Sequence, residues 1–446
     1  MKYEKWSLGY WLLKQYIRFT DWIIHDKVVL NGIENIPKNK PILFAPNHQN
    51  ALSDPMAILL HTRFQPVWLA RADIFKPGII TLILRFLKIM PVYRLRDGKE
   101  QLAKNDKTFA DSVKVLKNNG ALALFPEAAH SAKRQMLPHK KAVPRIVFMA
   151  EEKAQNQLDI HIIPTGIYYS SYWKFNRSIL VNFGKPILVN NYLESYKNNA
   201  NYATLALRND LEKAITPLTL AIKSKTHYNC IEQIRLIFGN AHAHRLQKEK
   251  GLKQRFLADQ HLVKKLDQLE QKNQKKIQEL CKAAAKLDET ARKYGLRTWL
   301  IENHENNFIK LGMNKLLLLL SFPVFAFGFI FNAVPFITID KIVRKKVNDY
   351  AFWSSFFLVL GFTIFPLFYF LELWAVSWLL TAVWHKVLFL CLLPFTGKFA
   401  FRWYILLLKT TGRARLLFLQ VFNPSVWRNV KQQQEQLFND LNKSTR

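Results

Sequence analysis

The chain has 446 residues, a formal net charge of +33 and 50% hydrophobic residues. Its length exceeds one ordinary domain, so we expect a globular unit joined to further structure. The charge indicates an anionic partner, for which nucleic acid, anionic lipid headgroups and a phosphorylated substrate are all candidates. The three cysteines are scattered without metal or redox spacing, which argues against a disulfide framework and favours a reducing, cytoplasm-facing location.

Residues 1–30 are aromatic and basic, with apolar side chains such as Trp11, Leu12 and Leu13 mixed with Lys14 and Arg18. The segment has neither the continuous apolar core nor the small-residue cleavage site of a signal peptide. We predict an amphipathic helix that lies in a membrane interface.

Residues 31–220 alternate short apolar runs with helical stretches. The runs are bounded by turn or polar residues, and each has the length of a strand: Pro41–Ala45, Ala121–Phe125, Ile160–Pro164 and Ile179–Phe183. Strands that alternate with helices predict an α/β domain with a largely parallel sheet flanked by helices.

Residues 221–312 are polar, basic and helical. Apolar residues recur at three- and four-residue steps from Leu262 to Tyr294, and only Asn273 interrupts this seam. The pattern predicts one long amphipathic helix. Either it packs on its own domain, or residues 262–294 form a homodimer as a coiled coil.

Residues 313–410 carry runs such as Leu316–Ile337 and Phe352–Trp384, which are too apolar for a soluble surface. A helical span needs roughly 20 apolar residues, so we predict C-terminal membrane helices. Basic residues flank the first run on both sides, at Lys315 and at 341–346, which favours a re-entrant hairpin. Glu372 lies inside the second run, and residues 411–446 form a polar tail.

The first chemically informative stretch is Phe44–Pro55, which holds His48 and Asp54. It follows a predicted strand and precedes a helix for which Asp54 is the expected N-cap. A histidine on such a loop can take a proton from an attacking hydroxyl, and a carboxylate can orient it. On a continuous helix the two side chains would point apart, so a turn must join them. In the alternative interpretation Asp54 only caps and His48 only packs.

Three further stretches follow. Phe125–Ser131 places Glu127 just beyond a strand, where open α/β sheets bind ligands. Pro91–Arg96 contains Arg94, whose guanidinium suits a forked phosphate contact, although a surface charge cluster is the simpler interpretation of this stretch by itself. Ile162–Ile167 is an apolar strand end that is most simply core.

Together, in chain order, these four stretches resemble the four motifs of the glycerol-phosphate acyltransferase family, which includes bacterial lysophosphatidate acyltransferases. They match its Asn-His…Asp element, its arginine block, its Phe-Pro-Glu-Gly block and its isoleucine-proline strand. Three further segments resemble its supporting elements: Ala70–Phe75, Pro138–Ala142 and Phe183–Ile187. The resemblance covers roughly residues 30–220.

The sequence departs from the family pattern at three points. Five residues separate His48 from Asp54 where most members have four, and alanines replace glycines at Ala128 and Ala142. Alanine fits wherever φ is negative. The wider spacing and the long C-terminal extension resemble the branch of glycerol-3-phosphate and dihydroxyacetone-phosphate acyltransferases.

The resemblance implies roles for six residues. His48 would be the general base on the acceptor hydroxyl, with Asp54 orienting it. Arg94 would hold the acceptor phosphate, with Arg71 and Lys140 as further candidates, and Glu127 would position the glycerol hydroxyls. The hydroxyl would attack the acyl thioester directly, as the lack of a Gly-x-Ser-x-Gly nucleophile motif also suggests. No metal or tightly bound cofactor is expected.

The expected partners are an acyl-CoA or acyl-carrier-protein donor, a phosphorylated glycerol acceptor and anionic membrane lipids, without nucleic acid. We expect a membrane location with the catalytic domain facing the cytoplasm. Acylation of lysophosphatidate or of another lyso-lipid is the enzymatic alternative. A non-catalytic basic membrane scaffold or nucleic-acid-binding protein is the alternative from another class, and it gives no reason for His48 and Asp54 to meet.

Overall fold

The computed structural model describes residues 3–93, 100, 103–246, 251–302 and 308–444. The chain forms two compact units. The first, here called the catalytic unit, contains Met1–Leu220 and Val343–Val359. The second, called the helical unit, contains Ala221–Ile342 and Leu360–Arg446. The catalytic unit therefore includes a short segment from the C-terminal third of the chain.

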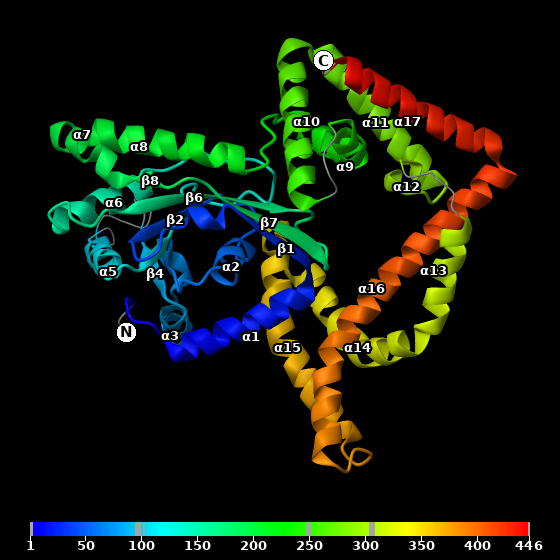
Figure 1. The fold of residues 1–446 in the computed structure, drawn as a ribbon, viewed down its shortest axis with the longest axis horizontal. Coiled ribbons are helices and arrows are strands. Elements are labelled where there is room, and N and C mark those ends of the chain that lie inside the picture. The colour runs from blue at the N-terminus through cyan, green and yellow to red at the C-terminus, as the bar shows by residue number, and fades with distance from the viewer. Residues whose placement is uncertain (1–2, 94–99, 101–102, 247–250, 303–307, 445–446) are drawn as a thin grey trace. The chain divides into compact units, whose positions relative to one another are not determined.

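An eight-stranded sheet is the centre of the catalytic unit (Figure 1). Its path is β1-β7-β6-β2-β5-β3-β4, and β8 pairs with β6 beside it. Most pairs are parallel, and the exceptions are β6–β7 and β6–β8. The strands are β1 His25–Asn31, β2 Ile42–Pro46, β3 Val67–Arg71, β4 Ile89–Val92, β5 Ala121–Ala123, β6 His161–Tyr169, β7 Arg177–Phe183 and β8 Ile187–Leu188. The predicted α/β fold with a largely parallel sheet is confirmed.

Helices cover both faces of this sheet (Figure 1). Along β2, Leu43 and Ala45 face one core, which α5, α6 and α8 complete. Ile42 and Phe44 face the other core with α2, because successive side chains of a strand point to opposite faces. The helices of this unit are α1 Leu8–Ile24, α2 Ser53–Leu59, α3 Ile79–Phe86, α5 Asn105–Lys117, α6 Ala142–Lys153, α7 Leu193–Asn198 and α8 Ala200–Ile215.

Helix α1 is amphipathic, but it is shorter than predicted. It ends at Ile24, and residues 25–31 continue as the edge strand β1. Tyr10 and Ile17 pack on α2, while a row of large apolar side chains is exposed. Helix α3 also exposes apolar residues along its length. Location in a membrane interface remains a prediction for α1, and the exposed face of α3 has the same character.

The helical unit contains α9 Tyr228–Arg245, α10 Leu252–Lys272, α11 Gln274–Lys293, α12 Thr298–Glu302 and α17 Pro424–Ser444. The prediction of one long helix across residues 262–294 is wrong, because the chain breaks at Asn273. The Asn273 side chain accepts a hydrogen bond from the Lys276 amide and so caps α11. The apolar seam is buried within the unit, where α10 and α11 contact α9 and α17. A homodimer through residues 262–294 stays a prediction. The apolar seam is already buried inside the unit, so a dimer would need another surface of these helices.

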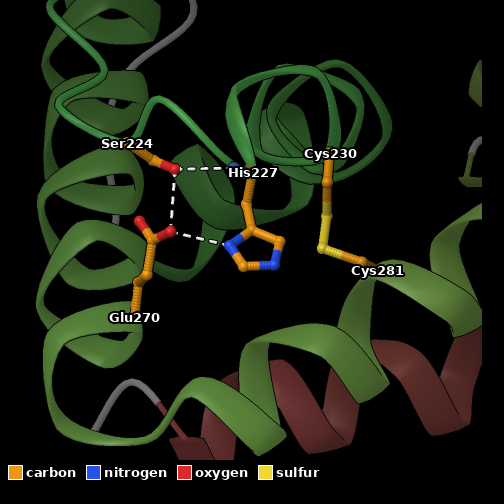
Figure 2. Close-up of a disulfide and its surroundings, with 5 residues drawn as sticks. All are labelled: Ser224, His227, Cys230, Glu270 and Cys281. Carbon is orange, nitrogen blue, oxygen red and sulfur yellow. Dashed lines mark hydrogen bonds and ion pairs between the residues drawn. A yellow bond between two sulfur atoms is a disulfide. The ribbon is translucent and has the colours of Figure 1, made fainter.

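A disulfide joins Cys230 on α9 to Cys281 on α11, with their Cα atoms 5.5 Å apart (Figure 2). The scattered cysteine positions predicted no disulfide, and for this pair that prediction is wrong. The two residues are 51 positions apart, and only the packing of α9 against α11 brings them together. Beside the disulfide, Glu270 accepts hydrogen bonds from His227 Nδ1 (2.6 Å) and Ser224 Oγ (2.9 Å). Because Ser224 contacts the glutamate and not the imidazole, this cluster lacks the order of a hydrolytic triad.

Within the part of the chain that the structure describes, three helices have the length and apolar composition to cross a membrane: Phe322–Lys346, Tyr350–Val376 and Val383–Phe422. The first is α14, the second is α15 (Trp353–Val376) with a short 3₁₀ turn before it, and the third is α16. α13 (Phe308–Leu320) precedes them. The basic cluster at 341–346 forms the C-terminal end of α14. Helix α16 runs unbroken through Pro394.

Gly328 and Gly397 allow α14 and α16 to approach each other closely. A Cβ added at Gly328 would lie 2.2 Å from the Thr396 carbonyl oxygen, so α14 and α16 are in close contact there. Asn332 of α14 donates to the Leu393 carbonyl of α16 and accepts from Tyr369 of α15. Small residues and interhelical polar contacts are typical of helix packing in membranes.

Candidate active site

The turn after β2 joins the two residues expected to act together. His48 Nδ1 lies 2.9 Å from Asp54 Oδ2, although five residues separate them. The Asp54 carboxylate is buried, whereas the His48 side chain is 15% exposed. With Nδ1 engaged by the carboxylate, the imidazole has Nε2 available for a proton, which is the arrangement of a general base with an orienting acid.

Asp54 contacts His48 without capping its helix. The N-cap of α2 is Leu52, so Asp54 lies inside the first turn, and the predicted N-cap is wrong. Its Oδ2 accepts hydrogen bonds from the backbone amides of Gln49 and Asn50, each at 2.7 Å. Its Oδ1 accepts from the Tyr169 hydroxyl at 2.9 Å. The carboxylate therefore fixes the 48–50 loop and the imidazole together, because one group holds both.

The imidazole of His48 lies between two rings. Phe125 stacks on it with ring centroids 3.8 Å apart and planes at 13°. The ring of His130 meets it edge-on at 5.3 Å. Burial lowers the pKa of His130, and the neighbouring His48 lowers it further. Sequence reasoning assigned no role to His130, although it lies in the Glu127 motif.

Glu127 supports this loop from beneath. Its Oε1 accepts from the His48 amide (3.0 Å) and its Oε2 accepts from the Leu137 amide (2.8 Å). The side chain is 1% exposed, and burial raises its pKa to about 8 against the opposing effect of these two amides. Because backbone amides engage both oxygens, the structure gives Glu127 a positioning role for His48. Each oxygen can accept a second hydrogen bond, so the contact with glycerol hydroxyls stays a prediction.

The predicted phosphate ligands lie in different surroundings. Arg94, with the rest of 94–99, is outside the described residues. Arg71 ends β3 and is half-exposed in an ion pair with Asp73. Lys140 is exposed, and its backbone amide donates to the Pro126 carbonyl beside Glu127. Two exposed cations thus stand near the carboxyl ends of β3 and β5.

A buried polar network beneath the loop was not predicted. Tyr172 donates to Gln49 Oε1 at 2.6 Å, and Arg177 donates to Ser53 Oγ at 3.1 Å. The Arg177 guanidinium also lies over the Tyr169 ring, 4.8 Å from its centroid. Tyr172 and Arg177 come from the β6–β7 region, far from the loop in sequence, so no local pattern marks them. Among the described residues, no group of three His, Cys, Asp or Glu side chains is placed to hold a metal ion.

This geometry, a histidine and carboxylate pair on the loop after a central parallel strand, is suited to proton abstraction from a hydroxyl. Comparison with known proteins identifies the domain. Residues 27–168 match the family model described as Acyltransferase. This part of the chain is therefore an acyltransferase-family domain, and the resemblance drawn from the four motifs is confirmed at the family level.

Two curated relatives are similar to parts of the chain. The 1-acyl-sn-glycerol-3-phosphate acyltransferase of Borreliella burgdorferi is 22% identical over 183 residues, covering 41% of this chain and 67% of that protein. Glycerol-3-phosphate O-acyltransferase 2 of Saccharomyces cerevisiae is 25% identical over 116 residues. That match covers 26% of this chain and only 16% of the yeast protein.

Among solved structures, the 1-acyl-sn-glycerophosphate acyltransferase PlsC from Thermotoga maritima is similar at 19% identity and a TM-score of 0.32. The match covers 46% of this chain and 78% of that one. A TM-score this low does not establish a shared fold, so the fold assignment depends on the sheet described above.

Proposed function

We propose that this protein is a membrane-bound O-acyltransferase of glycerolipid synthesis. It transfers a fatty acyl group from acyl-CoA or acyl carrier protein to a hydroxyl of glycerol-3-phosphate or dihydroxyacetone phosphate. The observation that carries the proposal is the contact between His48 and Asp54 inside an acyltransferase-family domain. A scaffold has no need to join these two residues.

The reaction follows from this pair. His48 Nε2 takes the proton of the acceptor hydroxyl as the hydroxyl oxygen attacks the thioester carbonyl carbon. Asp54 stabilises the resulting imidazolium through Nδ1. The tetrahedral intermediate collapses, the C–S bond breaks, and the imidazolium returns the proton to the leaving thiolate. The products are an ester and a free thiol, with no acyl-enzyme between them.

The acceptor phosphate needs cationic partners on the same side of the sheet. Arg94 is our first candidate, and Arg71 and Lys140 are the others, because guanidinium groups bind phosphate through two parallel hydrogen bonds. The net charge of +33 also favours phosphorylated acceptors and anionic lipids near the protein.

The alternative acceptor is lysophosphatidate, which the name of the Borreliella relative favours. The name of the yeast relative favours glycerol-3-phosphate, as does the His48–Asp54 spacing. Membranes containing the protein should be incubated with labelled acyl-CoA or acyl carrier protein and, separately, with each of the three acceptors. We expect glycerol-3-phosphate or dihydroxyacetone phosphate to be acylated fastest. Acylation of lysophosphatidate alone would assign the alternative.

The same assay with a His48→Ala protein separates enzyme from scaffold. We expect product formation to disappear while membrane association stays. No acylation of any of the three acceptors by the wild-type protein, with either donor, would contradict the proposed function.

We further propose that the catalytic unit faces the cytoplasm, where soluble acyl thioesters and phosphorylated acceptors are found. The basic cluster at the end of α14 and the tail from Arg413 onward would stay on the same side. Lys345 and Gln436 are both exposed and therefore suit single cysteines, one at the end of α14 and one in the tail. An impermeant thiol reagent applied to intact cells should label neither. Labelling of either site from outside would reject this orientation.

A further inference from the structure

The N-terminal end of α15, a membrane-capable helix, belongs to the catalytic unit. Residues 350–355, here called the docking segment, lie between the apolar parts of α14 and α15. Within it Ser354 and Ser355 are buried, at 6% and 7% exposure. A membrane anchor needs only apolar surface, so two buried hydroxyls at its start require another explanation.

Ser354 completes a directed chain of hydrogen bonds under the catalytic loop. Arg177 donates to Ser53 Oγ at 3.1 Å, and Ser53 and Ser354 hydroxyl oxygens are 2.9 Å apart. Ser354 donates to Asn50 Oδ1 at 2.6 Å. Because the amide oxygen only accepts, the Ser354 proton points to Asn50, and Ser53 must donate to Ser354. Chains of this kind strengthen one another in a buried site.

Ser355 holds the other side of the loop. Its Oγ accepts from the Leu52 amide at 2.9 Å. Leu52 is the N-cap position of α2, and Asp54 lies in the first turn of that helix. Ser354 thus contacts the loop at Asn50, before helix α2. Ser355 contacts the start of α2, the helix that carries Asp54.

The docking segment also reaches the rings around His48. Phe352 packs edge-on against His130 with centroids 4.8 Å apart, and His130 in turn contacts His48. Tyr350 accepts a hydrogen bond at its carbonyl oxygen from Trp173 Nε1, at 3.0 Å. Three hydrogen bonds thus connect Ser354 and Ser355 to residues 50–53 across some 300 positions of sequence, and the ring contact of Phe352 joins the same segment to His130.

We propose that the docking segment is part of the active site, and that Ser354 and Ser355 are positioning residues for the His48–Asp54 loop. The inference depends on the proposed function for the meaning of that loop. Its consequence is that the C-terminal extension completes the catalytic geometry as well as providing membrane helices. Catalysis then requires α15 to be docked on the catalytic unit.

The contact itself can be tested without an activity assay. Cysteines at positions 53 and 354, in full-length membrane-inserted protein carrying Cys391→Ala, should form a disulfide under mild oxidation. A non-reducing digest analysed by mass spectrometry should contain the peptide of residue 53 joined to that of residue 354. The control pairs Ser53→Cys with Ser377→Cys, because Ser377 lies just beyond the far end of α15 and bonds only to the Trp374 carbonyl. An absent 53–354 cross-link would overturn the proposal.

The positioning role is tested by the double variant Ser354→Ala/Ser355→Ala. We expect the displaced His48 to lower kcat roughly ten- to hundredfold. The donor and acceptor KM should stay within about twofold, because the substrates still bind. Ser377→Ala should leave both constants unchanged. If the cross-link forms and kcat of the double variant stays at the wild-type value, the positioning role is rejected and the segment is only an anchor. Inactivity of the wild-type protein would instead reject the proposed function, whatever the cross-link result.

Discussion

The two units each bury a carboxylate completely, and they use it differently. In the catalytic unit, Asp54 accepts from two backbone amides, a tyrosine hydroxyl and His48. In the helical unit, Asp259 lies between the guanidinium groups of Arg235 and Arg255. Permanent cations neutralise Asp259, so its charge serves to join α9 to α10. The partners of Asp54 leave its negative charge to act on an imidazole. Burial alone therefore does not mark a functional carboxylate, whereas its partners do.

The largest effect should come from His48→Ala. Removing a positioned general base lowers kcat by about 10²–10⁴. The thermal unfolding of the protein should change little, because the side chain lies at the edge of the core. His161→Ala provides a matched control, since that histidine is in the same unit and its imidazole contacts the nearby Asp159 carbonyl, away from the His48–Asp54 pair. A His48→Ala protein with near wild-type kcat would contradict the general-base role of His48. Asp54 would then have no functional difference from Asp259.

Arg235→Ala should produce the opposite result. It leaves Asp259 with one fewer cation in a fully buried position, a loss of roughly 3–5 kcal/mol in unfolding free energy. The kcat per folded molecule should stay constant. Arg292→Ala is the control, because Arg292 forms an exposed pair with Asp288 that contributes at most about 1 kcal/mol. Chemical denaturation of the purified protein in detergent measures both. An equal, small loss for the two variants would contradict the structural role of Asp259.

Cys230→Ser should destabilise the same unit through its disulfide. Closing a loop of this length stabilises a protein by roughly 2–4 kcal/mol. The difference from wild type should vanish in excess reductant, and Cys391→Ser should have no effect because Cys391 is free and exposed. Thermal unfolding with and without reductant is the measurement. Free thiols at both Cys230 and Cys281 in unreduced, denatured protein would contradict the disulfide. A reducing cytoplasm would produce that result by keeping both cysteines as thiols.

Arg94→Lys sharpens the comparison inside the catalytic unit. Lysine keeps the charge but lacks the two parallel hydrogen-bond donors of the guanidinium group. We therefore expect the acceptor KM to rise roughly three- to tenfold and the donor KM to stay unchanged. Arg71→Lys is the matched change, and its effect should be smaller because Asp73 already engages the Arg71 guanidinium. Steady-state kinetics with each substrate varied in turn tests this. If Arg94→Lys leaves both constants unchanged, the phosphate site lies elsewhere.

The smallest effect concerns two alanines that stand where the family has glycine. Ala128 has φ of +56°, in the left-handed region that costs a Cβ about 1–2 kcal/mol, whereas Ala142 opens α6. Ala128→Gly should therefore raise the unfolding free energy by about 1 kcal/mol, and Ala142→Gly should not raise it. Alanine fits without strain only where φ is negative, and Ala128 does not meet that condition. Equal responses of the two variants would show that the Ala128 backbone is not strained.

The sequence by itself determined the sheet and the chemical pair. His48 and Glu127 each follow an apolar run, and the two runs became β2 and β5, which pair in parallel. Parallel neighbours end at the same edge, so both side chains had to meet there. The five-residue spacing also required a turn between His48 and Asp54, and local geometry provides it.

Only the tertiary structure decided which distant residues support that pair. Asn273 interrupts the apolar seam at one position without shifting its period, so the sequence pattern predicted one helix where there are two. Cys230 and Cys281 meet because α9 packs on α11, and Ser354 meets Asn50 because the start of α15 folds with the catalytic unit. Periodicity and motif spacing report forces between near neighbours in the chain. Contacts across 50 or 300 positions depend on how whole helices pack, and no local pattern encodes that packing.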